Sequence, residues 1–132
     1  MLRYAFFDDF KGRDRLLLWG DQGDMRALTD FLRQFAESPK EVRFDQLGFY
    51  AVAGEIVTVV PRAKSGGHLK RVSPGNKAFR WELDQTASER FADLVDPLTT
   101  RPGHQYLEPW MVVAGEPTVM VSCGEYPEDL RP

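Results

Sequence analysis

The tetrapeptide Val52-Ala53-Gly54-Glu55 recurs as Val113-Ala114-Gly115-Glu116, and an apolar run follows each copy. A similar shift along the chain places Asp21 on Asp84, and we call the shift between these two aspartates the repeat offset. Each of the two aspartates precedes a stretch with the apolar spacing of a helix. We therefore predict that the chain contains two copies of one structural unit.

The apolar stripes of the two predicted helices also match at the repeat offset. Side chains three and four positions apart lie on one face of a helix, so each stripe predicts one buried face. We assign the units to residues 16–60 and 79–121, joined by a linker loop over residues 61–78, within a single domain of residues 1–132. The stripes are Leu28, Phe31, Leu32 and Phe35 in the first unit and Phe91, Leu94, Val95 and Leu98 in the second.

Each unit is predicted to run strand, helix, strand, strand. A further strand over residues 4–7 is expected to pair with residues 16–19. Asp21 is the expected N-cap of the first helix, and Thr86 with Glu89 has the capping-box pattern of the second. Within each unit, the strand-helix-strand step should place two strands parallel to each other. The repeated tetrapeptide is then expected to form a hairpin turn, which adds a third strand antiparallel to the second. The expected fold is α+β, a two-layer mixed β-sheet with two helices on one face, built from a duplicated β-α-β-β unit.

The bulk composition is that of a folded globular domain. The chain has 132 residues, of which 42% are hydrophobic and 28% are charged. Its apolar runs, such as residues 56–60, are much shorter than the roughly 20 residues of a membrane helix, so we expect no membrane partner. Cys123 has no second cysteine to pair with, and the N-terminus lacks a signal-peptide pattern, so a cytoplasmic location is expected.

The charges are unevenly distributed along the chain. The net charge is −3, but residues 56–81 contain six cations and no carboxylate, which leaves −9 on the remainder. An acidic body argues against a nucleic-acid partner and suits a basic protein, although the same carboxylates would also keep the protein soluble. The residues expected to bind that partner lie at helix starts and on helix flanks: Asp21, Asp24, Asp30, Asp84, Glu89 and Asp93.

The predicted linker suggests an alternative binding site. Its glycines, prolines and cations favour a loop that is mobile and dispensable for folding. Lys64, Lys70 and Arg71, together with the amides of Gly66 and Gly67, offer a possible phosphate site. The spacing of these residues is not that of a P-loop, so a solvated basic loop is the simpler interpretation.

Candidate catalytic groups are few. His104, Tyr106 and Glu108 alternate along one predicted strand, so a base, a hydroxyl and a carboxylate would share one face. The simpler interpretation of the same pattern is an exposed strand face with ordinary cross-strand contacts. One cysteine and two histidines do not supply the usual zinc ligands, so neither a metal nor a cofactor is expected. Cys123, beside Glu125, is expected to be a partly buried thiol.

Two stretches resemble short bacterial proteins, some of a kind proposed as immunity partners of secreted toxins. They are Trp19-Gly20-Asp21-Gln22-Gly23-Asp24-Met25-Arg26-Ala27-Leu28 and Val121-Ser122-Cys123-Gly124-Glu125-Tyr126-Pro127. The resemblance implies a non-enzymatic protein-interaction module that neutralises a toxin, and it supplies no catalytic residues. An acidic surface would complement a basic toxin such as a nuclease. The alternative is a small enzyme or phosphate-ligand binding protein that uses residues 62–77 and the alternating histidine, tyrosine and glutamate.

Overall fold

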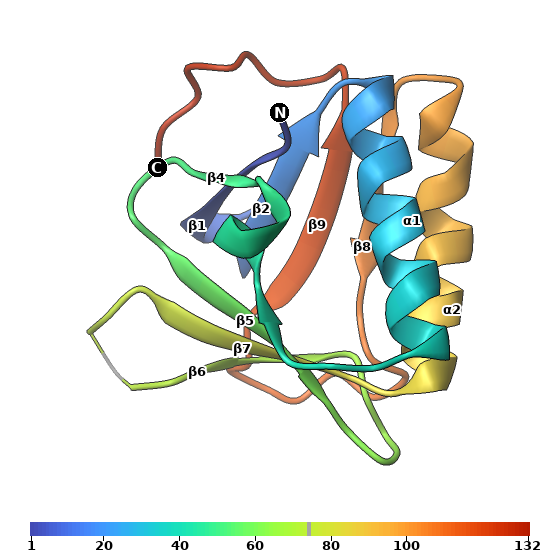
Figure 1. Cartoon of the computed structure of the whole chain (residues 1–132). Coiled ribbons are helices and arrows are strands. Elements are labelled where there is room, and N and C mark those ends of the chain that lie inside the picture. Colours follow the sequence, from blue (N-terminus) through green and yellow to red (C-terminus); the bar gives the residue numbers. More distant parts are fainter. Residues whose placement is uncertain (74) are drawn as a thin grey trace.

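A computed structural model describes residues 1–73 and 75–132, and their strands form two mixed sheets beside a layer of helices (Figure 1). The fold is therefore α+β, as predicted. We call the sheets A and B. In spatial order, sheet A consists of β4 (Tyr50–Ala51), β1 (Arg3–Phe10), β2 (Arg13–Gly20), β9 (Thr118–Cys123) and β8 (Gly103–Leu107), and sheet B of β3 (Val42–Arg43), β5 (Ile56–Pro61), β7 (Ala78–Leu83) and β6 (His68–Arg71).

The strands are divided between two sheets, whereas a single sheet was expected. The reason is that the two units exchange strands. The first strand of each unit pairs in parallel with the last strand of the other unit, β2 with β9 and β7 with β5. The order β1-β2-β9-β8 in sheet A consequently matches the order β6-β7-β5-β3 in sheet B. The repeated plan is present in both halves, but each sheet needs both halves to be complete.

The helices α1 (Gln22–Glu37) and α2 (Gln85–Val95) lie side by side and run in opposite directions (Figure 1). Their N-caps are the two aspartates that define the repeat offset. Asp21 accepts a hydrogen bond from the amide of Asp24 at 2.9 Å, and Asp84 accepts one from the amide of Ala87 at 2.8 Å. The capping box predicted at residues 86–89 is wrong because Asp84 already caps the helix two residues earlier, while α1 has a capping box between Asp21 and Asp24.

The main core lies between the helices and the inner faces of both sheets. At its centre the ring of Trp81, on β7, stacks on Phe91 of α2 with centroids 5.7 Å apart, and its edge meets Phe44. Phe44 begins the 3-10 helix η1 (Phe44–Leu47), and a second 3-10 helix, η2 (Asp96–Thr99), continues α2. Both helices therefore pack on one side of the strands, as predicted, and their stripes face the core, with Phe31 and Leu94 only partly buried.

A second apolar cluster lies on the outer face of sheet A. It contains Phe7, Leu17, Trp19 and Met120, and the C-terminal residues 124–132 cover it. Within that segment Tyr126 and Leu130 pack on the cluster, and the indole N–H of Trp19 donates a hydrogen bond to the carbonyl of Pro127 at 3.0 Å. The centre of sheet A is therefore buried on both faces, which explains the uninterrupted apolar run of β2.

The region predicted to be a linker loop contains a strand. Residues 68–71 form β6, which pairs antiparallel with β7, and Leu69 is fully buried in the main core. The loop prediction is wrong there because glycines and cations dominate the composition and hide the single buried position. Deleting this segment would remove the edge strand β6 from sheet B, so we expect the deletion to destabilise the fold and not to be neutral. Pro74, which belonged to the predicted linker, lies outside the described residues.

The repeated tetrapeptides form equivalent turns, with Gly54 and Gly115 both at a φ of +80°. The hairpins expected around them are wrong, because β4 pairs with β1 and β3 pairs with β5. Instead, the glutamate after each glycine reaches the opposite sheet. Glu55, just before β5, accepts a hydrogen bond from the amide of Phe6 in sheet A at 2.9 Å. Glu116, before β9, lies 2.7 Å from the Nδ1 atom of His68 in sheet B.

Candidate functional site

The predicted acidic binding residues do not form one surface. Asp21 and Asp84 cap helices that run in opposite directions, so these carboxylates lie at opposite ends of the helical layer. A hydrogen bond from the backbone amide of Asp24 lowers the pKa of Asp21, although its slight burial opposes this. Asp24 accepts a hydrogen bond from the amide of Asp21 at 2.9 Å. These three carboxylates therefore stabilise helix starts.

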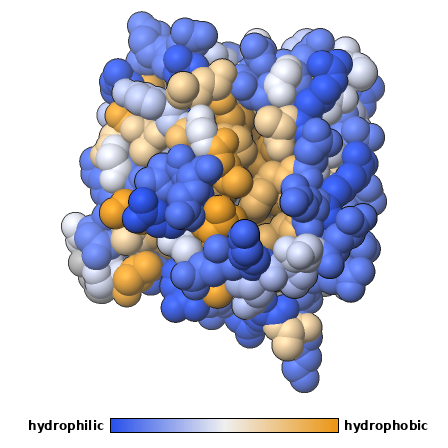
Figure 2. All heavy atoms as spheres, viewed as in Figure 1, coloured by the Kyte–Doolittle hydropathy of each residue, from blue (hydrophilic) through white to orange (hydrophobic). Residues whose placement is uncertain are grey.

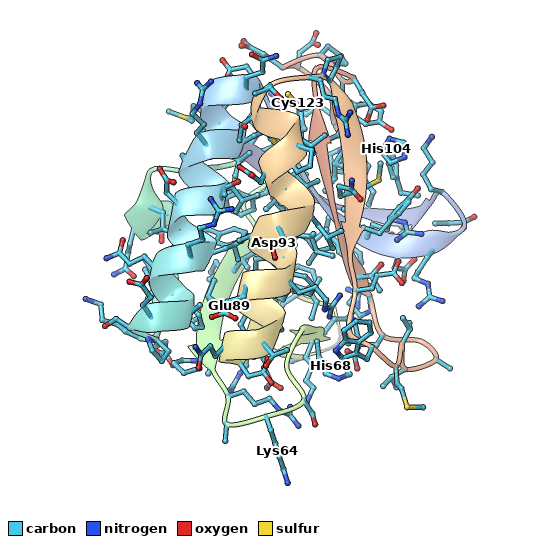
Figure 3. The ribbon with its side chains drawn as sticks, turned by 90° about the vertical axis from the view of Figure 1, so that its right-hand side faces the viewer. Lys64, His68, Glu89, Asp93, His104 and Cys123 are labelled. Carbon is cyan, nitrogen blue, oxygen red and sulfur yellow. The ribbon has the colours of Figure 1, made fainter. Side chains whose placement is uncertain are left out.

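The other three predicted carboxylates are exposed on the outer side of the helices. Glu89 and Asp93 lie on the same side of α2 (Figure 3). Asp30 occupies the position on α1 that the repeat offset relates to Asp93. Arg33 of α1 lies 3.8 Å from Asp93 and 3.7 Å from Asp96, so part of the negative charge is neutralised across the helix pair. Sequence reasoning missed the further carboxylates Glu37 and Asp96, although their helical spacing from the predicted residues would have identified them. We call Asp30, Glu37, Glu89, Asp93 and Asp96 the acidic helix surface.

The three cations of the alternative phosphate site are not brought together. Lys64 points away from the body of the molecule (Figure 3). Lys70 lies 3.1 Å from Glu82, whereas the guanidinium of Arg71 lies 4.3 Å above the ring of Phe6. Neighbouring residues of a strand point to opposite faces, so Lys70 and Arg71 cannot line one site. Gly66 has a packing role, since a Cβ atom there would clash with the amide nitrogen of Asp84.

His104 and Tyr106 share one face of β8, as predicted, with ring centroids 5.6 Å apart. Arg15 links Glu108 to this pair, because its guanidinium lies 4.5 Å from the centroid of the Tyr106 ring and 3.5 Å from the Glu108 carboxylate. The partner of His104 is instead Glu125, with both carboxylate oxygens 3.1 Å from its Nδ1 atom. Glu125 belongs to the segment that covers sheet A. Sequence reasoning could not find this pair, because it paired residues 111–113 with β9. In the structure β8 is the antiparallel neighbour of β9, and this pairing brings His104 close to the residues that follow β9.

The His104–Glu125 pair has only part of a catalytic arrangement. A carboxylate at Nδ1 orients a histidine as in general-base catalysis. The nearby hydroxyl of Ser122, however, donates to Glu125 at 2.5 Å and not to the histidine, so it is not activated as a nucleophile. Burial raises the pKa of the Cys123 thiol, and the charges of Asp21, Asp24 and Glu125 raise it further. The thiol is more completely buried than predicted, and burial with a raised pKa makes a thiol inert.

Glu125 should make the attachment of the C-terminal segment sensitive to acid. Burial raises its pKa, but the hydrogen bonds of Ser122 and His104 together lower it below the ordinary value of 4.5. A lowered pKa stabilises the folded state above the ordinary value, and this contribution is lost as the pH falls through the folded-state pKa. We expect Glu125→Gln to lower the melting temperature at pH 7, and the difference from the parent to shrink as the pH falls below the ordinary value and through the lowered folded-state pKa. A difference that stays constant during a pH titration of the melting temperature would contradict this assignment.

The residues between β8 and β9 form an exposed apolar loop. Trp110, Met111 and Val113 have 77%, 82% and 50% of their surface exposed, and Val112 is also exposed. The guanidinium of Arg90, on α2, lies 4.3 Å from the centroid of the Trp110 ring. Burial lowers the pKa of Arg90, and Asp84 partly offsets this. We call residues 110–113 the apolar loop.

The equivalent segment of the first unit is packed more closely, although Tyr50 is exposed. There, Phe49 enters the main core, and residues 50–51 form β4 at the edge of sheet A. The segment before the tetrapeptide therefore differs in burial between the two copies. Sequence reasoning missed the apolar loop because exposed and buried apolar runs have the same pattern, and it placed residues 111–113 in a strand.

A shallow groove beside α1 is another apolar feature of the surface. Phe31, Phe35, Val42 and Leu47 contribute to its lining. Figure 2 shows hydrophobic atoms in this region, whereas the outer side of the helices at the right is mostly hydrophilic. Val42 and Leu47 remain only partly exposed there, in contrast to the side chains of the apolar loop.

Other classes of site find no support in the part of the chain that the structure describes. Residues 1–73 and 75–132 contain no group of three or more His, Cys, Asp or Glu side chains placed to hold a metal ion. Neither α1 nor any other described helix is long and apolar enough to cross a membrane. Comparison of the chain with protein-family models and with curated proteins gave no match.

Proposed function

We propose that this protein is a non-enzymatic interaction module that binds another protein through the apolar loop. The observation that carries the proposal is the exposure of four consecutive apolar residues, 110–113. Isolated exposed apolar side chains are common on soluble proteins, but a run of four is typical of a binding surface. Tryptophan and methionine are also enriched where protein interfaces are buried.

The toxin-neutralising role implied by the resemblance is part of this proposal, and so is a basic partner. The acidic helix surface supports the expected charge of that partner. Arg33 lies near two of its carboxylates, so one positive charge offsets two negative charges and the surface remains acidic. Opposite charges accelerate the encounter of two proteins, and salt weakens this effect. A basic partner should therefore associate more slowly as the ionic strength rises.

The proposal predicts a large effect of Trp110→Ser. The partner would first be captured from native lysate, identified by mass spectrometry and purified. Its dissociation constant should then rise by about 30-fold for Trp110→Ser, because a buried interface tryptophan contributes on the order of 2 kcal/mol. The melting temperature should change little, since the ring is mostly exposed.

Tyr50→Ser is the matched control, because Tyr50 is an exposed aromatic residue outside the apolar loop. Its variant should bind the partner as the parent does. Equal affinities for the parent and Trp110→Ser would sink the proposal. A substrate that is turned over by the parent and not by His104→Gln would favour the small-enzyme alternative.

A further inference from the structure

The outer face of sheet B carries a row of cations that crosses the sheet. The strand register places Arg43 opposite Thr58, Thr58 opposite Arg80, and Arg80 opposite Lys70. The cationic side chains of this row point away from the core, because their neighbours Leu69 and Trp81 point into it. Neighbouring strands lie about 4.8 Å apart, so the row spans roughly 14 Å.

The charge of this face is not balanced by its own carboxylate. Glu82 lies 2.6 Å from Arg62, 3.1 Å from Lys70 and 3.9 Å from Arg80. Burial raises the pKa of Glu82, but hydrogen bonds from Lys70 and Arg62 lower it below the ordinary value, so the carboxylate stays ionised. Three cations surround Glu82, and another carboxylate, Glu116, contacts His68 at the end of the same face, so an excess of positive charge remains. Arg43, at the other end of the row, is paired with Asp45 at 2.8 Å.

The equivalent face of sheet A shows why this surface is open. There, Leu17 and Trp19 occupy the positions that the repeat offset relates to Arg80 and Glu82, and residues 124–132 cover them. Charged side chains on sheet B do not bind an apolar segment of that kind. A partner that covers this face must instead bring negative charge.

The flanking residues distinguish between acidic partners. Ile56 and Val72 are exposed beside the row, and they suit the aliphatic side chains of a polypeptide. Among the described residues of this face there is no Phe, Tyr or Trp, which proteins use to stack the bases of single-stranded nucleic acids. A protein segment therefore fits the face better than a nucleic acid does.

We propose that the outer face of sheet B binds an extended acidic segment of the partner protein, with carboxylates on Arg80 and Lys70 and aliphatic side chains on Ile56 and Val72. This inference rests on the proposed interaction function and names the chemistry of a second contact. The overall charge of the partner and the charge of one of its segments are separate properties. A basic partner on the acidic helix surface therefore remains compatible with an acidic segment on sheet B.

The first test uses a fluorescent peptide of alternating glutamate and valine, measured by anisotropy at low salt. Lys70→Gln with Arg80→Gln should weaken its binding by at least about fivefold, because two charge contacts are lost. The matched control, Lys40→Gln with Arg101→Gln, removes the same charge from exposed positions outside this face and should have a much smaller effect. Equal effects of both pairs would overturn the inference, and so would tighter binding of an oligothymidylate than of the peptide.

The second test uses the purified partner and separates this inference from the proposed function. A loss of affinity in both Trp110→Ser and the Lys70→Gln, Arg80→Gln variant supports both contacts. A loss in Trp110→Ser alone overturns the sheet B contact and leaves the proposed function intact. A loss in the cation variant alone overturns the apolar-loop contact and supports the sheet B contact. Unchanged affinity in every variant overturns both.

Discussion

Replacing Trp81 with alanine is expected to lower the free energy of unfolding by about 4 kcal/mol. The indole is fully buried at the centre of the main core. It stacks on Phe91 of α2 at an interplanar angle of 13° and meets Phe44 edge-on at 6.1 Å. Alanine would remove these contacts and leave a cavity between sheet B and the helical layer. Chemical denaturation followed by far-ultraviolet circular dichroism would measure the loss.

Trp81→Phe is the control that separates packing from hydrogen bonding. Within residues 1–73 and 75–132, the Nε1 atom of Trp81 has no hydrogen-bond partner, so phenylalanine would sacrifice no such bond. The smaller ring can still stack on Phe91, and the expected cost is about 1 to 1.5 kcal/mol. If Trp81→Phe were as damaging as Trp81→Ala, stacking on Phe91 would not be the main contribution.

The helices could be predicted from the sequence because their signals are local. The stripe of apolar side chains fixes the buried face of α1, and Asp21 at its N-cap lies next to the amides that it binds. The stripe of α2 was predicted in the same way, but its cap was placed at Thr86, whereas Asp84 is the observed cap. A cap and a stripe involve residues only a few positions apart, so no knowledge of tertiary structure was needed.

The division into two sheets could not be predicted in this way. Alternation shows which side chains of β2 and β7 are buried, but it does not show which copy supplies the parallel neighbour. Both answers satisfy the same pattern, and the pairing of β2 with β9 links residues about 100 positions apart. Strand β6 was missed for another reason, since Leu69 is the single buried side chain in this short element.

The candidate site shows the same limit. Charge alone grouped Asp21 and Asp84 with Asp93, although the first two cap helices and the third is exposed. His104 and Tyr106 were correctly placed on one face because they belong to one strand. Glu125 reaches His104 only because the chain folds back over sheet A. Contacts of that kind depend on the finished fold and have no signature in the spacing of residues.

The glutamates of the repeated turns provide the last prediction. Glu55 is almost fully buried between the two sheets, where its carboxylate accepts from the amides of Phe6 at 2.9 Å and Ala53 at 3.0 Å. Glu55→Ala would leave both amides without their charged acceptor. The expected loss of unfolding free energy is about 3 kcal/mol, because bonds to a charged group are worth about 1.5 to 3 kcal/mol each and water replaces part of them.

Two further variants test whether this loss comes from the carboxylate that joins the sheets. Glu55→Gln keeps one oxygen that can accept a hydrogen bond. Its total loss of unfolding free energy should therefore be about 1 to 2 kcal/mol, which is less than that of Glu55→Ala. Glu116→Ala removes the equivalent residue of the second unit, whose carboxylate is more exposed and contacts the side chain of His68. Its cost should stay near 1 kcal/mol, as for other partly exposed pairs. Equal losses in Glu55→Ala and Glu116→Ala would show that the buried amides of Phe6 and Ala53 are not what makes Glu55 important.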